Sequence, residues 1–301
     1  MIDSQKSQEP SLLATRPERG NLVHNCAPVH TGCGPRRAPQ WAMLIDLRFI
    51  RRRLDELAWT LLPGVCVLCG SRSRTSMDLC EPCREALPHN DRSCCACALP
   101  LRVLDDALCT QCLVKQPPFA RAIAALRYVE PVTRMIHRLK FNGSRVDARV
   151  LGSLLAARVN RDYRGTALPE LIVPVPLSRE RLFRRGHNQA ALLARWVGST
   201  LDIAIDYGCC RRLRHTPPQT GLSRSARLRN LSGAFDVTRS FSNMSIALVD
   251  DVMTTGSTVT ALTQTLLAAG AVDVHVWAAA RTPQIDSETR VAMERHFDPL
   301  E

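Results

Sequence analysis

Asp250 and Asp251 are adjacent carboxylates that follow an apolar run at 246–249 and precede a turn of small, hydroxyl-bearing residues at 254–258. The apolar run predicts a buried strand that ends at the acid pair, and residues 259–269 carry a helical pattern. A turn that opens a helix presents free backbone N–H groups and the positive end of the helix dipole, which suits a phosphate. The stretch therefore predicts a phosphate site beside two acids.

Two adjacent carboxylates at a strand end are costly unless ribose hydroxyls or a metal ion compensate their charge. Gly256 would let the backbone approach a ligand closely, and the neighbouring hydroxyls add donors. The alternative is an ordinary strand–turn–helix with two solvated aspartates. The chain has neither a GxxxxGK[ST] loop nor a GxGxxG fingerprint, which disfavours an ATPase and a dinucleotide-dependent dehydrogenase.

Four CxxC pairs in the N-terminal half carry a second chemistry. Each pair sets two thiolates on one tight turn, and two such turns give the S₄ set that tetrahedral Zn²⁺ takes. Eight cysteines make two closed sites, so we expect structural zinc, with nucleic-acid reading by the fingers left open. We expect neighbouring pairs to combine, a cross-braced arrangement being the alternative, and Cys95 makes one ligand ambiguous. The expected ligands are Cys66, Cys69, Cys80, Cys83, Cys94, Cys97, Cys109 and Cys112.

Composition narrows the class of partner. The formal net charge of +12 favours anionic partners such as phosphates, nucleic acid or an acidic protein. No secretory signal opens the chain, and its apolar patterns are interrupted by charges, so we expect no transmembrane helix. Thirteen cysteines without a secretory signal indicate metal ligands in a reducing cytosol, and we expect a cytoplasmic protein.

The order of patterns predicts five segments. Residues 1–42 lack periodicity and are expected to be disordered, and 43–63 form a basic amphipathic helix. A double zinc-ribbon module follows at 64–116, then an α/β domain at 117–285 and a tail at 286–301. Within the α/β domain we expect strands at 122–129, 171–176, 201–207, 246–249 and 271–281. Helices are expected at 131–141, 146–161, 189–200 and 259–269, with a polar loop at 177–189 and a long loop at 209–232. This alternation predicts a parallel sheet flanked by helices, with ligands at the carboxyl ends of its strands.

Two arginine-rich loops are expected near that edge. The first spans 177–189 and the second 211–230. Arginine makes bidentate contacts to phosphate, although a solvated basic face is the plainer interpretation.

The acid pair and its turn closely resemble the 5-phosphoribosyl-1-pyrophosphate (PRPP) signature of type I phosphoribosyltransferases. The order of motifs from about residue 60 to 282 resembles the ComF family, which joins a zinc ribbon to such a domain and is associated with natural competence. The motifs are the cysteine pairs, Leu139-Lys-Phe141, Val173-Pro-Val-Pro176, Arg185-Gly-His-Asn-Gln189, Gln219 with Arg227-Leu-Arg-Asn230 and Phe235, and Val249-Asp-Asp-Val-Met-Thr-Thr-Gly256. His187 departs from the pattern, because the family more often has Phe or Tyr there.

The resemblance implies roles for these residues. Asp250 and Asp251 would contact the ribose hydroxyls, with Mg²⁺ nearby, and residues 219–229 would close over the site. It implies phosphoribosyl transfer from PRPP to an acceptor that the sequence does not reveal. The alternative is a non-catalytic single-stranded DNA-binding accessory that keeps the PRPP pocket as a sensor or docking site. Competence helicase or uptake proteins are the implied partners. The implied phosphate contacts are Lys140, Arg185, Thr254, Thr255, Gly256, Ser257 and Thr258.

Overall fold

The computed structural model describes residues 64–73, 75, 77–101, 107–213 and 233–284. All belong to the second of two compact units, 32–301, into which the chain divides. The expectations for 1–42, 43–63, the closing loop at 219–229 and the tail at 286–301 lie outside the described residues. Within the described residues, no helix is long and apolar enough to cross a membrane.

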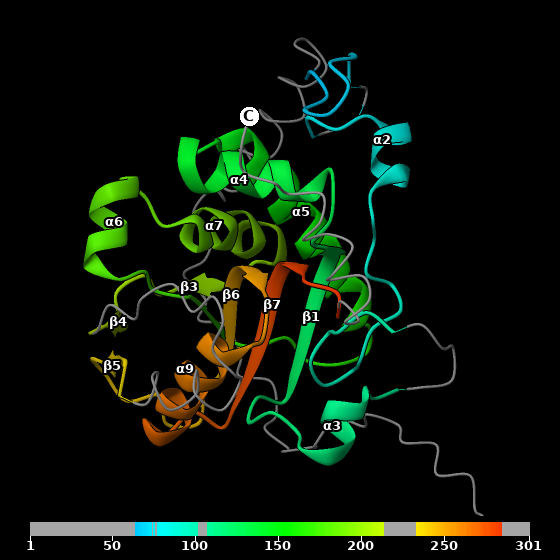
Figure 1. The fold of residues 1–301 in the computed structure, drawn as a ribbon. Helices are drawn as coiled ribbons and strands as arrows, with labels where there is room; N and C mark the ends of the chain where they lie inside the picture. Colours follow the sequence, from blue (N-terminus) through cyan, green and yellow to red (C-terminus); the bar gives the residue numbers. More distant parts are fainter. Residues whose placement is uncertain (1–63, 74, 76, 102–106, 214–232, 285–301) are drawn as a thin grey trace, which may run out of the picture. The chain divides into compact units, whose positions relative to one another are not determined.

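Five parallel strands form the central sheet (Figure 1). Their order across the sheet is β1 (Arg121–Arg127), β7 (Asp273–Arg281), β6 (Ser245–Met253), β2 (Leu171–Pro174) and β3 (Ala204–Ile205). Every pairing between neighbours is parallel, so the carboxyl ends of the strands lie along one edge. A separate antiparallel pair joins β4 (Cys210–Arg212) to β5 (Phe235–Val237).

Helices cover both faces of this sheet (Figure 1). The helices α4 (Val132–Asn142), α5 (Arg145–Asp162) and α7 (Gln189–Leu201) share one hydrophobic cluster with Ile172, Val249 and Trp277. The helix α9 (Ser257–Ala268) packs in the other cluster with Val173, Leu248 and Val276. Successive strand residues thus point to opposite faces, and both faces are buried, as a parallel sheet requires.

Two local expectations were wrong. Residues 179–185 form a helix, α6 (Arg179–Arg185), within the segment predicted as a polar loop. Ser178 caps its N-terminus by accepting a hydrogen bond from the Arg181 amide at 3.4 Å, and Gly186 ends it in the left-handed conformation. The strand β6 also runs on through Asp250 and Asp251 to Met253, because the ladder with β7 continues to Arg281.

The cysteine-rich segment consists of two similar units. Each begins with a CxxC turn, where the amide four residues after the first cysteine donates to its carbonyl: Gly70 to Cys66 and Ala98 to Cys94. Each ends in a short helix that begins directly after the third cysteine, α2 (Glu81–Ala86) after Cys80 and α3 (Thr110–Val114) after Cys109. These helices were not predicted, because a helix of five or six residues carries no period to detect.

The two units pack in different hydrophobic clusters. Cys66, Leu79 and Cys80 belong to the cluster that contains α4, α5 and α7. Cys94, Cys97 and Cys112 belong to the cluster that contains α9. The ribbons therefore contribute to the packing of both sheet faces.

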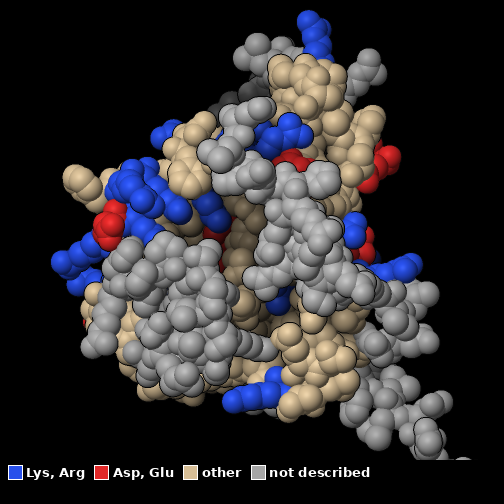
Figure 2. Space-filling view, in the orientation of Figure 1, with Lys and Arg blue, Asp and Glu red and all other residues tan. Residues whose placement is uncertain are grey.

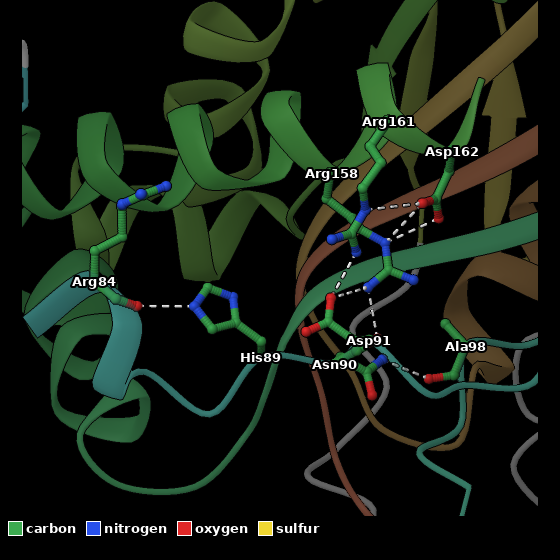
Figure 3. A network of polar contacts seen from close by, with 8 residues as sticks. All are labelled: Arg84, His89, Asn90, Asp91, Ala98, Arg158, Arg161 and Asp162. Atoms are coloured by element: carbon green, nitrogen blue, oxygen red, sulfur yellow. Dashed lines mark hydrogen bonds and ion pairs between the residues drawn. The ribbon is translucent and has the colours of Figure 1, made fainter. Parts of the chain in front are cut away.

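Polar contacts tie the cysteine-rich segment to α5 (Figure 3). Arg158 donates to the Asn90 carbonyl at 2.6 Å, and Arg161 pairs with Asp91 at 2.6 Å. Asn90 in turn donates to the carbonyl of Ala98 at 2.9 Å. Ala98 occupies the left-handed conformation (φ 56°) that glycine takes at the matching position of the first unit, Gly70. The Asn90 contact thus supports a turn that a side chain disfavours.

Candidate functional site

The eight cysteines form two groups of four. The first cluster is Cys66, Cys69, Cys80 and Cys83, and the second cluster is Cys94, Cys97, Cys109 and Cys112. Within each cluster the four Sγ atoms lie within 4.8 Å of one another. Neighbouring CxxC pairs therefore combine, and Cys95 belongs to neither cluster.

The sulfur spacing fits a tetrahedral metal. Thiolates about 2.3 Å from a central Zn²⁺ lie about 3.8 Å apart, and the Sγ–Sγ separations here are 3.6 Å for Cys69–Cys80 and 3.7 Å for Cys97–Cys109. A hydrogen bond from Cys97 lowers the pKa of the Cys94 thiol, whereas a hydrogen bond to Cys94 and burial raise the pKa of Cys97 and burial raises that of Cys112, so metal binding would displace protons from this cluster. Four sulfur ligands leave no open position, so both clusters have the donor set of structural zinc sites.

The clusters differ in their access to solvent. All four cysteines of the second cluster are buried, whereas Cys69 of the first is exposed and Cys83 is partly so. We expect the first cluster to exchange its metal more readily, because its sulfurs are the more accessible.

The acid pair lies near the carboxyl end of β6, the central strand of the sheet. Asp251 is buried, and its Oδ2 lies 3.0 Å from Nζ of Lys140, near the C-terminus of α4. Asp250 keeps some exposure, and its Oδ1 accepts a hydrogen bond from the Asp251 amide at 2.9 Å. Lys140 and the pair are thus brought together from elements far apart in the sequence.

Burial and the pairing with Lys140 separate the two acids electrostatically. Burial, followed by the neighbouring charge of Asp251, raises the pKa of Asp250 well above its ordinary value. Burial also disfavours the charged form of Asp251, but the charge and hydrogen bond of Lys140 outweigh it and lower the pKa of Asp251. The same ion pair outweighs the burial of Lys140 and raises the pKa of its ammonium group. Ionisation is therefore disfavoured at Asp250 and favoured at Asp251, beside the Lys140 ammonium group.

Gln189 extends this network to Arg185. The Gln189 side-chain amide lies 3.5 Å from Asp251 Oδ1, and its Oε1 accepts from Arg185 at 3.2 Å. Arg185 also lies over the ring of Phe141 at 5.3 Å. Burial lowers the pKa of the Arg185 guanidinium, with Asp251 opposing the shift. Sequence reasoning quoted Gln189 in a motif but gave it no role, and the position directly after the helix-capping Asn188 was the available signal.

His187 connects the segments that carry Lys140 and Arg185. Its Nε2 lies 2.7 Å from the Leu139 carbonyl, and its Nδ1 lies 2.8 Å from the Arg185 carbonyl. The ring also packs against Gly143, where an added Cβ would lie 3.3 Å away. Gly143 ends α4 in the left-handed conformation (φ 59°), so glycine is needed there twice over. His187, which departs from the family pattern, thus links the backbone beside Lys140 to that of Arg185.

The turn at 254–258 follows the acid pair after two residues and opens α9. Thr254 is exposed, Thr255 and Thr258 are partly exposed, and Gly256 and Ser257 are buried. Thr255 Oγ1 lies 3.0 Å from Ser257 Oγ, which orders the hydroxyls across the turn. Gly256 has φ 76°, and a Cβ there would meet the Met253 methyl at 2.9 Å. Glycine is therefore required by the turn itself as well as by any ligand.

A second arginine approaches the acid pair from β4. Burial and the nearby charge of Arg181 lower the pKa of Arg212, and Asp250 opposes that shift. Arg212 also forms a parallel bridge with Ser178, the capping residue of α6. Sequence reasoning placed Arg212 in a basic loop and gave it no individual role in the site, because its pairing in β4 with Phe235 joins residues far apart in the sequence.

The structure thus gathers Lys140, Arg185 and the acid pair, and sets the turn at 254–258 beside them along the chain. Comparison with known proteins identifies the lineage. The Double zinc ribbon domain family model matches residues 57–113. The chain is 37% identical over 224 residues to the DNA utilization protein YhgH of Salmonella typhimurium. This alignment covers 73% of the chain and 98% of the relative. The chain is 39% identical over 179 residues to Competence protein F of Haemophilus influenzae, which covers 58% of this chain and 78% of the relative.

This chain belongs to the ComF family. The resemblance inferred from the motifs is therefore confirmed, as is a parallel sheet flanked by helices with an N-terminal double zinc ribbon. Among solved structures, the hypoxanthine phosphoribosyltransferase of Trypanosoma cruzi matches with a TM-score of 0.31 and 16% identity. That match covers 51% of the ComF-family chain and 93% of the enzyme.

Proposed function

We propose that this ComF-family protein binds PRPP with Mg²⁺ at the carboxyl edge of its sheet and acts as a phosphoribosyltransferase. The observation that carries the proposal is the acid pair on the central strand, balanced by Lys140 and followed directly by a helix-opening turn. Carboxylates accept hydrogen bonds from vicinal hydroxyls, and a helix start accommodates a phosphate. A 5-phosphorylated ribose offers both groups at opposite ends of one small ring.

Each residue of the candidate site then has a definite role in binding PRPP. Asp250 and Asp251 hold the ribose hydroxyls, and the turn at 254–258 holds the 5-phosphate through its amides and hydroxyls. Lys140 and Arg185, kept in place by the Gln189 and His187 contacts, face the pyrophosphate. Bound Mg²⁺ supplies positive charge that stabilises the departing pyrophosphate.

The protonation states favour ligand entry. In the free protein Lys140 satisfies Asp251, and the raised pKa of Asp250 keeps that carboxyl protonated more readily. A protonated Asp250 avoids two adjacent negative charges in the empty site. Arrival of Mg²⁺ and hydroxyl donors would favour its ionisation, so we expect PRPP binding to release a proton.

A calorimetric titration with PRPP and Mg²⁺ tests the binding. Asp250→Ala should weaken affinity roughly ten- to hundredfold, because a charge-assisted hydrogen bond contributes about 1.5–3 kcal/mol. Asp236→Ala, which removes an exposed carboxylate from β5, is the matched control. Wild-type affinity in the Asp250 variant would overturn the PRPP assignment. Screening nucleobases and amines for PRPP-dependent pyrophosphate release then tests transfer and identifies the acceptor.

The names of the relatives suggest the cellular setting. One is called a DNA utilization protein and another a competence protein, and we propose that this chain likewise serves DNA uptake from the cytoplasmic side. We propose that residues 64–116 form its double zinc-ribbon module and residues 117–285 its phosphoribosyltransferase-like domain.

A second function, binding of single-stranded DNA, is favoured by the surface of α6. The helix carries arginines at 179, 181, 184 and 185, and Phe183 is 93% exposed among them. Figure 2 shows basic side chains gathered on the part of this face where α6 lies. An exposed aromatic ring between arginines suits base stacking with phosphate contacts. The partner proteins of such a complex would be those that deliver the strand, such as a competence helicase.

A further inference from the structure

Arg281 ends β7, and its guanidinium is buried beneath the turn that follows β6. Its Nη1 donates to the carbonyl of Met253 at 2.9 Å and also to that of Thr254. Its Nε donates to the carbonyl of Cys97 at 3.1 Å. Cys97 belongs to the second cluster, and 254–258 is the proposed phosphate turn. A single buried side chain therefore bridges a zinc-ribbon turn and the candidate ligand site.

We propose that Arg281 is a positioning residue that couples the second cluster to the phosphate turn, so that loss of metal there loosens the turn. Among the described residues, the first cluster packs on the opposite face of the sheet from α9, and its ion pair with the α/β domain runs from Asp78 to Arg149 of α5. The ligand part of this inference rests on the proposed PRPP site, whereas the coupling itself does not.

Peptide geometry explains how the arginine acts on the turn. In a trans peptide the carbonyl and the following N–H point in opposite directions. Holding the Met253 and Thr254 carbonyls against Arg281 therefore turns the amides of Thr254 and Thr255 to the opposite side. Those amides open the segment proposed to hold the 5-phosphate. The fixed positive charge behind the two carbonyls also compensates the charge of an anion bound in front of them.

Packing on the ribbon side makes the link stiff. Cys94, Cys97, Cys109 and Cys112 are all buried and share a hydrophobic cluster with Met253 and Val259, which flank the turn. A metal that fixes the Cys97 turn fixes its carbonyl as well. Without metal, that CxxC turn loses its sulfur anchor, and Arg281 loses one of the acceptors that orient it.

Hydrogen exchange of the ligand-free protein tests the coupling without any substrate. Arg281→Met keeps the bulk of the side chain but removes every donor, and should speed exchange of the amides at 254–257 at least tenfold. The matched control is Arg149→Met, because Arg149 also joins the α/β domain to the cysteine-rich segment, but through Asp78 of the first ribbon. Its exchange at 254–257 should equal that of the wild type. Equal exchange in Arg281→Met and the wild type would overturn the proposal.

A metal-site variant gives an independent arm that also guards against misfolding of Arg281→Met. Cys109→Ser should lower zinc content by about one ion per chain and speed exchange at 254–257, while amides of β6 at 246–249 stay protected. Cys80→Ser should lower zinc content equally and speed exchange within the first ribbon only. Matching exchange at 254–257 in the two cysteine variants would overturn the coupling.

The ligand arm separates this inference from the proposed function. PRPP affinity should fall about tenfold in Arg281→Met and Cys109→Ser and remain unchanged in Arg149→Met. If the wild type fails to bind PRPP, the proposed function fails, and the exchange results still decide the coupling. If the wild type binds and both coupled variants bind equally well, the coupling to the ligand site is wrong while the proposed function stands.

Discussion

Asp250 and Asp251 are adjacent in the chain but differ in chemistry. Asp251 is ion-paired with Lys140 at 3.0 Å, and Asp250 has the Asp251 amide as its hydrogen-bond donor. Asp250 is therefore costly to ionise, and Asp251 is costly to neutralise. The two aspartates should answer differently to the same substitution, although their sequence context treats them alike.

The raised pKa of Asp250 has a definite consequence for stability. The stabilisation of the fold by protonated Asp250 is fully present below the pKa of this group in the unfolded chain, near 3.8. It is lost as pH rises through the pKa of Asp250 in the folded protein. Asp250→Asn mimics the protonated acid, so the variant should match the wild type near pH 3.8 and be more stable above it. The gain is at most about 1.4 kcal/mol per pH unit within that window. Denaturation curves at a series of pH values measure it, and a pH-independent difference from wild type would contradict the assignment.

The ion pair should behave in the opposite way. Asp251→Asn leaves the Lys140 ammonium without its carboxylate, and Lys140→Met leaves Asp251 buried and charged. Each should destabilise the fold, and the double variant should recover roughly 1–3 kcal/mol of the summed loss. A double-mutant cycle in urea measures this coupling. Strict additivity of the two single effects would show that the pair contributes nothing to stability.

At the scale of elements, α6 decides how the basic groups are presented. Its cap at Ser178 and its left-handed end at Gly186 bring the chain from β2 to the start of α7 through one short helix. Arg185 and Gln189 then face the acid pair, while Phe183 and the exposed arginines at 179 and 184 face solvent. One helix thus divides its side chains between the candidate pocket and the outer surface.

The outer surface of α6 can be tested separately from the pocket. Arg179→Ala combined with Arg184→Ala should weaken single-stranded DNA binding. The dependence of log affinity on log salt concentration should become shallower by the amount expected for roughly two phosphate contacts. PRPP affinity should stay nearly constant, because neither residue has a contact with the acid pair. Arg164→Ala combined with Arg195→Ala removes the same charge from exposed sites elsewhere. Equal loss in both double variants would reduce the effect to net charge alone.

At the scale of the molecule, two repeated ribbons pack into the two hydrophobic clusters of one parallel sheet. Each ribbon is too small to bury a core of its own, so metal and docking together stabilise it. The buried second cluster and the more exposed first cluster should therefore differ in metal retention.

Zinc analysis tests this difference. The purified protein should carry about two Zn²⁺ per chain. Release to a chromogenic chelator should occur in two phases, with the first cluster losing its metal faster because Cys69 is exposed. A metal content near zero in protein prepared without chelators would contradict both sites. Release in one phase would contradict the difference between them.

Much of this architecture could be predicted from local patterns. The helices at 132–142 and 145–162 and the cysteine groupings follow from periodicity and spacing. The helix α6 was missed because four arginines in seven residues hide any apolar face, although Ser178 and Gly186 are ordinary end signals. The contacts of Gln189 with Asp251 and of Arg281 with Cys97 join residues far apart in sequence, which no local pattern encodes.

The order of strands bears on how the nascent chain matures. The strand β7 is the last described strand to be synthesised, yet it lies between β1 and β6. A ribosome-bound chain can therefore complete its local ribbon turns and acquire metal while β1 still lacks its partner. Parallel pairing across such a separation is slow and leaves apolar strand edges exposed to other chains. Because Arg281 sits at the end of β7, the candidate ligand site would be completed only in the final step of folding.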